Sequence, residues 1–138
     1  LIEHDLRMKI GIDLHGVSDA FPEFFAEMTR LFVGADHHVV IMTGELVTPA
    51  LHEQLKRCGL HYNELFSIAQ HHKDKGTPMV FDEKNTPWID VDLWDRAKGE
   101  YAKEHGLDIV LDDTDRYAPY FETPYMFCKA LRRPAPKD

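Results

Sequence analysis

Three apolar runs of the sequence end in residues that can bind metal or phosphate. Asp13 ends "KIGID", Thr43 and Gly44 end "VVIMTG", and Asp112 and Asp113 end "DIVLDD". Mg²⁺ is usually bound in proteins by one or two carboxylates together with the phosphate of a substrate. A carboxylate can also act as a nucleophile and form an aspartyl-phosphate. These residue types therefore predict a magnesium and phosphate site, in which Thr43 and Gly44 hold phosphoryl oxygens.

The elements that must position these residues are buried strands alternating with amphipathic helices. One predicted helix has both ends marked, by a capping Thr48 followed by Pro49 and by Gly59. Such alternation indicates βαβ units. The expected fold class is α/β: a Rossmann-like three-layer α/β/α sandwich with a mainly parallel five-stranded sheet and no large cap domain. The predicted strands are residues 8–14, 38–43, 64–69, 107–114 and 125–130, and the predicted helices are residues 21–32, 48–59 and 93–106.

The carboxyl ends of parallel strands meet at one edge of a sheet, and ligands of such folds bind there. We therefore expect Asp13, Thr43 and Asp112 to converge at that edge. Ordinary solvated side chains would be scattered along the elements instead. The coincidence of three strand ends is the strongest functional signal in the sequence.

A lysine beside this edge would neutralise the charge that phosphoryl oxygens carry. Lys98 is the favoured candidate and shares a helix face with Trp94, four residues before it. Trp94 itself is more typical of core packing than of a platform for a ligand. Lys75 and Lys103 are the alternative lysines.

The succession of these segments resembles the haloacid dehalogenase superfamily. "IGIDLHGV", "VVIMTG", the lysine of "LWDRAKGEYAKEHG" and "DIVLDDTDRY" follow one another in that family's order, over residues 8–129. Thr43 and Lys98 match the residues with which the family binds phosphate.

The resemblance implies that Asp13 is the nucleophile of the reaction. It also implies that Asp13, Asp112 and Asp113 hold Mg²⁺ as the cofactor, together with the backbone carbonyl of His15. The function implied is a Mg²⁺-dependent phosphohydrolase, a phosphoric monoester hydrolase that acts on a phosphorylated substrate through an aspartyl-phosphate on Asp13.

His15 departs from the family pattern, because the family's phosphatases usually have a second aspartate at this place. Histidine has an unperturbed pKa of about 6.5 and can act as general acid and general base. We therefore expect His15 to serve in that role. The alternative is a catalytically weak or inactive module that binds phosphate or a nucleotide. Asp115 is a further carboxylate nearby in the sequence.

Residues 70–92 form a short insertion after the third predicted strand. This length allows a hairpin or a loop, but no folded cap. The site is therefore expected to be open, or covered by another subunit of a homo-oligomer. Trp88 lies in this segment and is a candidate for contact with a ligand.

The 138 residues suffice for one domain, predicted over residues 8–130. Residues 1–7 precede "MKIGID" and are expected to be an N-terminal extension. Residues 131–138 are rich in proline and charge, and are expected to be a flexible tail.

Composition limits the partners and the compartment. The net charge of −8 argues against a nucleic-acid-binding surface as a whole, although it leaves room for a local basic patch. No apolar run has the length of a bilayer span, so no membrane partner is expected. Cys58 and Cys128 form neither a disulfide framework nor a CxxC pair, which favours the reducing cytoplasm.

Two other kinds of site are less consistent with the sequence. The adjacent histidines at 37–38 and 71–72 lack zinc-ligand spacing, and neighbouring side chains usually point apart. A response-regulator receiver domain also uses Asp, Thr, Lys and Mg²⁺. However, its acidic pair ends the first strand, whereas here the pair comes late in the chain.

Overall fold

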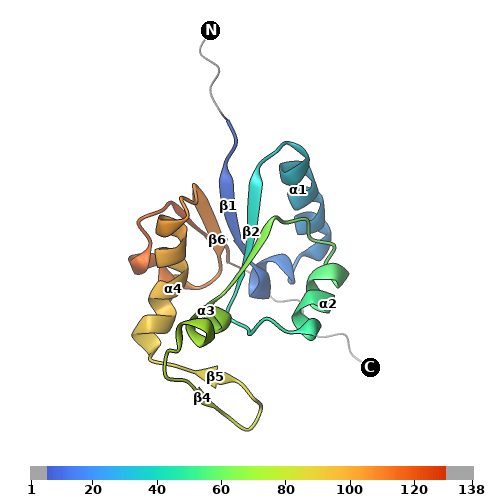
Figure 1. Cartoon of the computed structure of the whole chain (residues 1–138). Helices are drawn as coiled ribbons and strands as arrows, with labels where there is room; N and C mark the ends of the chain where they lie inside the picture. Colours follow the sequence, from blue (N-terminus) through green and yellow to red (C-terminus); the bar gives the residue numbers. More distant parts are fainter. Residues whose placement is uncertain (1–5, 130–138) are drawn as a thin grey trace.

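A parallel sheet of five strands forms the centre of the computed structural model, which describes residues 6–129 (Figure 1). The strand order is β3-β2-β1-β6-β7, and every neighbouring pair is parallel. The predicted α/β fold with a mainly parallel five-stranded sheet is confirmed. The strands are β1 (Lys9–Asp13), β2 (His38–Thr43), β3 (Glu64–Ser67), β6 (Ile109–Asp112) and β7 (Tyr125–Phe127).

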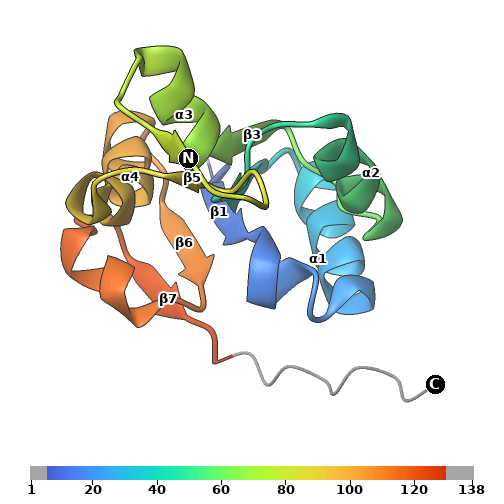
Figure 2. The ribbon, with the colours of Figure 1, turned by 90° about the horizontal axis from the view of Figure 1, so that it is seen from below.

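Helices cover both faces of the sheet and give the three layers that the sequence predicted. α1 (Pro22–Gly34) and α2 (Pro49–Arg57) lie on one face, and α4 (Val91–Glu104) lies on the other (Figure 2). The helices begin where local signals predict. Thr48 caps α2 through its side chain, and Asp90 caps α4 in the same way.

Each face of the sheet has its own hydrophobic core. In β2, Val39 and Ile41 belong to the core that also contains residues of α1 and α2. Val40 and Met42, which alternate with them, belong to the core shared with α4. Successive side chains of a strand point to opposite faces, so a strand buried on both faces has a continuous apolar sequence. This is why "HVVIMT" shows no alternation.

The third strand ends earlier than predicted, and a helix replaces its end. β3 stops at Ser67, and α3 (Ile68–Lys75) follows at once. The Ser67 side chain accepts a hydrogen bond from the Gln70 amide at 3.0 Å and so caps α3. The apolar run across this boundary resembles a continuous strand, which concealed the serine cap.

The insertion after β3 therefore consists of more than a hairpin or a loop. After α3, the chain forms an antiparallel hairpin of β4 (Val80–Phe81) and β5 (Pro87–Trp88) and then enters α4. The hairpin that the length of this segment allows is thus present. Figure 1 shows the hairpin projecting from the end of the molecule at which α3 lies.

Two predicted segments lie wholly or partly outside the described residues, namely the tail 131–138 and the first five residues of the extension 1–7. Within residues 6–129, no helix combines the length and hydropathy needed to cross a membrane.

Candidate functional site

Three carboxylates converge at the carboxyl ends of β1 and β6. These strands are parallel neighbours, with Ile12 opposite Leu111, so the residues that follow lie at the same height. Asp13 and Asp112 are both buried there, with 5% and 0% exposure, and Asp113 is half-buried. One oxygen from each of the three lies within 4.8 Å of the others. Among the described residues, this is the only group of three potential metal ligands that close together.

Lys98 reaches the same place from α4. Its Nζ lies 2.8 Å from Asp13 Oδ1 and 2.7 Å from Asp112 Oδ2, and its side chain is 3% exposed. The ring of Tyr117 lies beneath the ammonium, with its centroid 5.4 Å from Nζ. The structure thus brings Lys98 to the predicted site. The alternatives lie elsewhere: Lys103 is exposed and pairs with Glu122, and Lys75 is exposed at the end of α3.

The charges of Asp13, Asp112 and Lys98 balance only while Asp13 is protonated. Burial raises the pKa of Asp13 to about 8; the Lys98 ammonium opposes that rise, and the Asp112 carboxylate adds to it. Burial alone would lower the pKa of Lys98, but the two carboxylates outweigh it and hold the pKa above its usual value. Once Asp13 is ionised, two buried carboxylates beside a single ammonium leave excess negative charge, which a bound cation would neutralise.

The donor set fits Mg²⁺. Octahedral Mg²⁺ has ligands at about 2.0–2.1 Å, so opposite ligands are about 4.1 Å apart. Adjacent ligands are about 2.9 Å apart, so the three carboxylates, which lie within 4.8 Å of one another, would close in around the ion. Lys98 uses one oxygen of Asp13 and one of Asp112, and each carboxylate keeps a second oxygen. The second oxygen of Asp112 accepts a bond from the Thr114 amide at 3.1 Å, which orients this carboxylate.

A tight turn, η1 (Leu14–Ser18), connects β1 to the rest of the site. Gly16 has a φ of 85°, and a Cβ placed on it would lie 2.0 Å from Asp113 Oδ2. A side chain here would therefore displace the Asp113 carboxylate. The Ser18 hydroxyl donates to the Asp13 carbonyl at 2.8 Å, and the Gly16 amide donates to Asp19 Oδ1 at 2.7 Å. Sequence reasoning missed the positioning residues Gly16, Ser18 and Asp19, although a turn-forming "GVSD" was the available signal.

His15 faces carboxylates other than Asp13. Its Nδ1 lies 3.1 Å from Asp19 Oδ2. Its Nε2 lies 3.3 Å from Glu45 Oε1, without the alignment of a hydrogen bond. One ring nitrogen, Nδ1, is thus hydrogen-bonded within the η1 turn, whereas Nε2 lies beside Glu45 without a hydrogen-bond partner. His15 is half-buried, and its backbone carbonyl remains a predicted metal ligand.

Thr43 and Gly44 lie at the end of β2, as predicted. The Thr43 hydroxyl is fully buried and accepts a hydrogen bond from the Glu45 amide at 3.2 Å. Gly44 packs against Trp94, whose Cζ2 lies 2.7 Å from the position that a Cβ would occupy. Their predicted contact with phosphoryl oxygens stays a prediction. The structural role of Gly44 is to let the backbone approach the indole ring.

A cavity of about 460 Å³ adjoins these strand ends, and we call it the hairpin pocket. Its walls include His15, Gly44 and Glu45 on one side and Trp94 of α4 on another. Residues 84–87, at the turn of the β4–β5 hairpin, close it from the insertion. The predicted site and the insertion therefore share one pocket.

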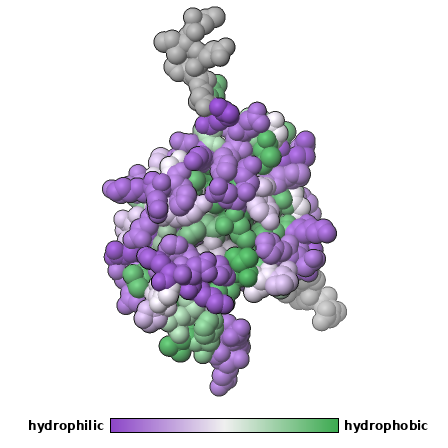
Figure 3. Space-filling model, viewed as in Figure 1, coloured by the Kyte–Doolittle hydropathy of each residue, from purple (hydrophilic) through white to green (hydrophobic). Residues whose placement is uncertain are grey.

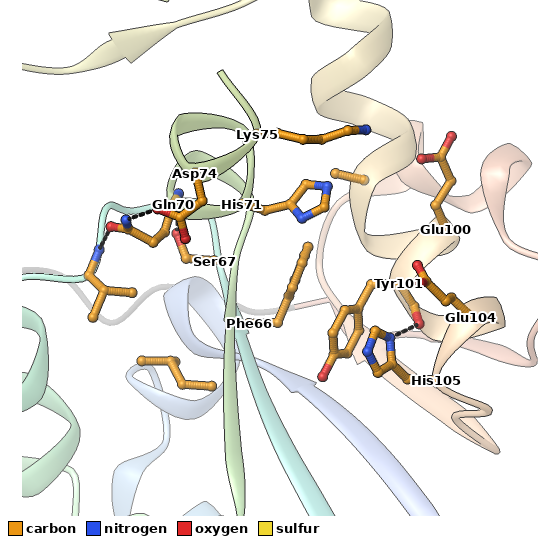
Figure 4. A pocket seen from close by; sticks show the side chains of 13 residues that line it. Phe66, Ser67, Gln70, His71, Asp74, Lys75, Glu100, Tyr101, Glu104 and His105 are labelled. Carbon is orange, nitrogen blue, oxygen red and sulfur yellow. Dashed lines mark hydrogen bonds between the residues drawn. The ribbon is translucent and has the colours of Figure 1, made fainter. Parts of the chain in front are cut away.

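A second cavity, of about 480 Å³, lies between α3 and α4, away from the carboxylates (Figure 4). Three rings stack along its wall: the Phe66 and Tyr101 centroids are 4.2 Å apart, and those of Tyr101 and His105 are 4.0 Å apart. Of the predicted site residues and their alternatives, only Lys75 lines it.

The hairpin also has exposed apolar side chains. Figure 3 shows hydrophobic surface gathered at the end of the molecule where the hairpin projects. Val80, Phe81 and Trp88 are 71%, 44% and 62% exposed. Trp88, a predicted ligand contact, points its indole Nε1 at Asp82 at 3.0 Å. The predicted homo-oligomer that would cover the site stays a prediction.

Comparison with known proteins finds a similarity to solved structures. No family model matches the sequence, and no curated protein matches it either. A solved structure, a universal stress protein in complex with cAMP, aligns with 90% of this chain and 98% of its own. The TM-score is 0.49, and the sequence identity is 10%.

This comparison corrects the sequence interpretation. The identification with the haloacid dehalogenase superfamily is corrected: no family model matches the sequence, and the solved structure that aligns with it is a universal stress protein. The predicted phosphohydrolase acting through an aspartyl-phosphate on Asp13, with His15 as general acid and base, is wrong with it. The physical reason is that polar residues at the carboxyl ends of parallel strands are common to ligand-binding α/β sheets. Their order locates a site without defining its chemistry.

Proposed function

We propose that this chain is a binding module for a phosphorylated ligand, which it holds through Mg²⁺ without turning it over. Asp13, Asp112 and Asp113 would hold the ion. When bound, Mg²⁺ supplies positive charge that pairs with phosphate oxygens. Lys98 and the end of β2 at Thr43 would border the phosphate.

The observation that carries the proposal is the cluster of three carboxylates around one ammonium at the ends of β1 and β6. Buried carboxylates are costly unless they are paired or coordinate a metal. Asp13 and Asp112 share one ammonium, and Asp113 adds a third carboxylate at the same place. A cation with a phosphate group would satisfy this arrangement, and the strand ends are where such folds bind ligands.

Binding is favoured over hydrolysis by the orientation of His15. Hydrolysis of a phosphate ester needs a group that transfers a proton to the leaving oxygen, within hydrogen-bond reach of it. His15 has its two ring nitrogens 3.1 Å from Asp19 and 3.3 Å from Glu45. These contacts direct the ring at Asp19 and Glu45: Nδ1 is hydrogen-bonded to Asp19, and Nε2, which has no hydrogen-bond partner, lies beside the Glu45 carboxylate.

The experiment is a calorimetric titration of Mg²⁺, with and without inorganic phosphate, into the wild type and two variants. Asp112→Asn should weaken Mg²⁺ binding at least tenfold. Asp115→Asn, which changes an exposed carboxylate three residues away, should leave it unchanged. Circular dichroism checks that both variants fold. Equal Mg²⁺ affinity in all three proteins would refute the assignment of the carboxylates.

A second measurement tests the absence of turnover. The wild type should release no phosphate from an aryl phosphate in the presence of Mg²⁺. A Mg²⁺-dependent activity that disappears in Asp13→Asn would contradict a purely binding role.

A further inference from the structure

The hairpin pocket has a shape and chemistry that the binding of a phosphate group does not use. Its volume of about 460 Å³ lies within the range of small-molecule sites, and far exceeds what one phosphate needs. It shares Gly44 with the strand end at which the phosphate would lie. A ligand with its phosphate at the carboxylates would therefore extend its organic part into this pocket.

The hairpin tip that closes the pocket is organised in advance. Oδ1 of Asp82 accepts hydrogen bonds from the backbone amides of Lys84 and Thr86, at 2.9 and 2.8 Å. Its Oδ2 accepts the bond from the Trp88 indole. Asn85, between the two amides, has a left-handed φ of 61°. One carboxylate thus fixes the turn, so that the exposed polar tip faces the pocket in a defined conformation.

The Trp94 indole supplies a flat apolar wall. Its Nε1 donates to the Tyr117 hydroxyl at 2.9 Å, and its six-membered ring contacts the Gly44 backbone. The ring is therefore held at both edges while it lines the pocket. A fixed aromatic side chain is a stacking surface for a planar ring, and base stacking on such side chains is a common mode of recognition.

Glu45 adds a hydrogen-bond acceptor to the same pocket. Its backbone is held on both sides, since its amide donates to Thr43 and its carbonyl accepts a bond from the Ser67 hydroxyl. Its side chain is 52% exposed. An ionised carboxylate only accepts hydrogen bonds, so it selects a group that donates them.

We propose that the hairpin pocket holds the nucleobase of a nucleotide whose base bears an exocyclic amino group. The base would stack on Trp94, and its amino group would donate to Glu45. The proposal rests on the proposed function, because the phosphate of the same nucleotide would bind at the carboxylates. It names the class of ligand that the site selects.

The test is calorimetry in the presence of Mg²⁺ with AMP, IMP and ribose 5-phosphate. AMP should bind at least tenfold more tightly than ribose 5-phosphate, which lacks the base; tenfold corresponds to about 1.4 kcal/mol. AMP should also bind about fivefold more tightly than IMP, which carries a carbonyl oxygen in place of the amino group.

Variants identify the residues responsible. Glu45→Ala should abolish the preference for AMP over IMP, whereas Glu53→Ala, an exposed glutamate on α2, should preserve it. Asp82→Ala should weaken the binding of AMP several-fold and leave the binding of ribose 5-phosphate unchanged. Glu83→Ala is its neighbouring control. Each variant changes an exposed residue, so folding is expected to survive.

The outcomes separate the two proposals. If AMP and ribose 5-phosphate bind equally, and both lose affinity in Asp112→Asn, the nucleobase proposal is overturned while the phosphate site stands. If Glu45→Ala and Asp82→Ala bind AMP as tightly and as selectively as their control variants do, the pocket assignment is likewise overturned. If none of the three compounds binds with Mg²⁺ present, the proposed function fails and the nucleobase proposal falls with it.

Discussion

Replacing Lys98 with methionine removes the one ammonium between two buried carboxylates. Methionine keeps a side chain of similar length, so the change is chiefly one of charge. In the wild type, Nζ lies 2.8 Å from Asp13 and 2.7 Å from Asp112. In Lys98→Met, these carboxylates would face each other in a place where they are 5% and 0% exposed.

The expected loss of stability follows from that burial. Removing one partner of a buried ion pair typically costs about 3–5 kcal/mol, because it leaves an uncompensated buried charge. The cost is reduced when a carboxylate takes up a proton, and without Lys98 the pKa of Asp13 should rise further above its present value of about 8. The folded-state pKa then lies above the unfolded one, so the proton stabilises the fold at low pH and that stability is lost as pH rises.

Urea unfolding of the wild type and of Lys98→Met at pH 5.5 and pH 8.5, with and without Mg²⁺, measures this loss in the free energy of unfolding. We expect a loss of about 3–5 kcal/mol at pH 8.5 without Mg²⁺, a smaller loss at pH 5.5, and partial recovery with Mg²⁺. Lys103→Met removes an exposed ion pair with Glu122 on the same helix and should cost at most about 1 kcal/mol. A loss below 1 kcal/mol at pH 8.5 for Lys98→Met would refute the charge argument.

Three further predictions test the site through unfolding measurements. Gly16→Ala should weaken Mg²⁺ binding and cost more stability than the control Gly76→Ala. Both glycines have a positive φ, but of the two only Gly16 would bring its Cβ against another atom, Asp113 Oδ2. Equal losses of stability and an unchanged Mg²⁺ affinity would contradict this. Gly44→Ala should cost about 1–3 kcal/mol, because its Cβ would lie 2.7 Å from the Trp94 ring, and a loss below 0.5 kcal/mol would disprove that contact. In the wild type without Mg²⁺, stability should fall as pH rises through about 8, where Asp13 ionises in the folded state. Mg²⁺ should remove this dependence. A profile of stability against pH that is flat without Mg²⁺ would mean that Asp13 is already ionised.

The fold could be predicted because its signals are local and repeat along the chain. The β2 sequence is almost continuously apolar, and Thr48 is a typical N-cap residue of the helix after it, so the sequence identifies both elements. The convergence of Asp13 and Asp112 then follows from topology, since parallel neighbouring strands end at the same edge. The lysine followed from the same reasoning, because its helix packs over these strands.

The parts that could not be predicted depend on contacts between distant segments. The sequence predicts Ile68 and Ala69 as the end of a strand, whereas they begin α3, because Ser67 caps a helix inside an apolar run. The orientation of His15 depends on Glu45, which lies 30 residues further along the chain. The packing of Gly44 on Trp94 joins the end of β2 to α4. No periodicity within one segment encodes contacts of this kind.

His15 shows why position alone does not define chemistry. The spacing from Asp13 made this residue a candidate acid and base, and spacing is all that the sequence offers. A proton-transfer group must also have a free nitrogen directed at the reacting oxygen. Nδ1 is hydrogen-bonded to Asp19 at 3.1 Å, and the nitrogen without a hydrogen-bond partner, Nε2, lies 3.3 Å from Glu45. The same Glu45 lines the hairpin pocket, so the carboxylate beside His15 is also a hydrogen-bond acceptor where a ligand's amino group can meet it.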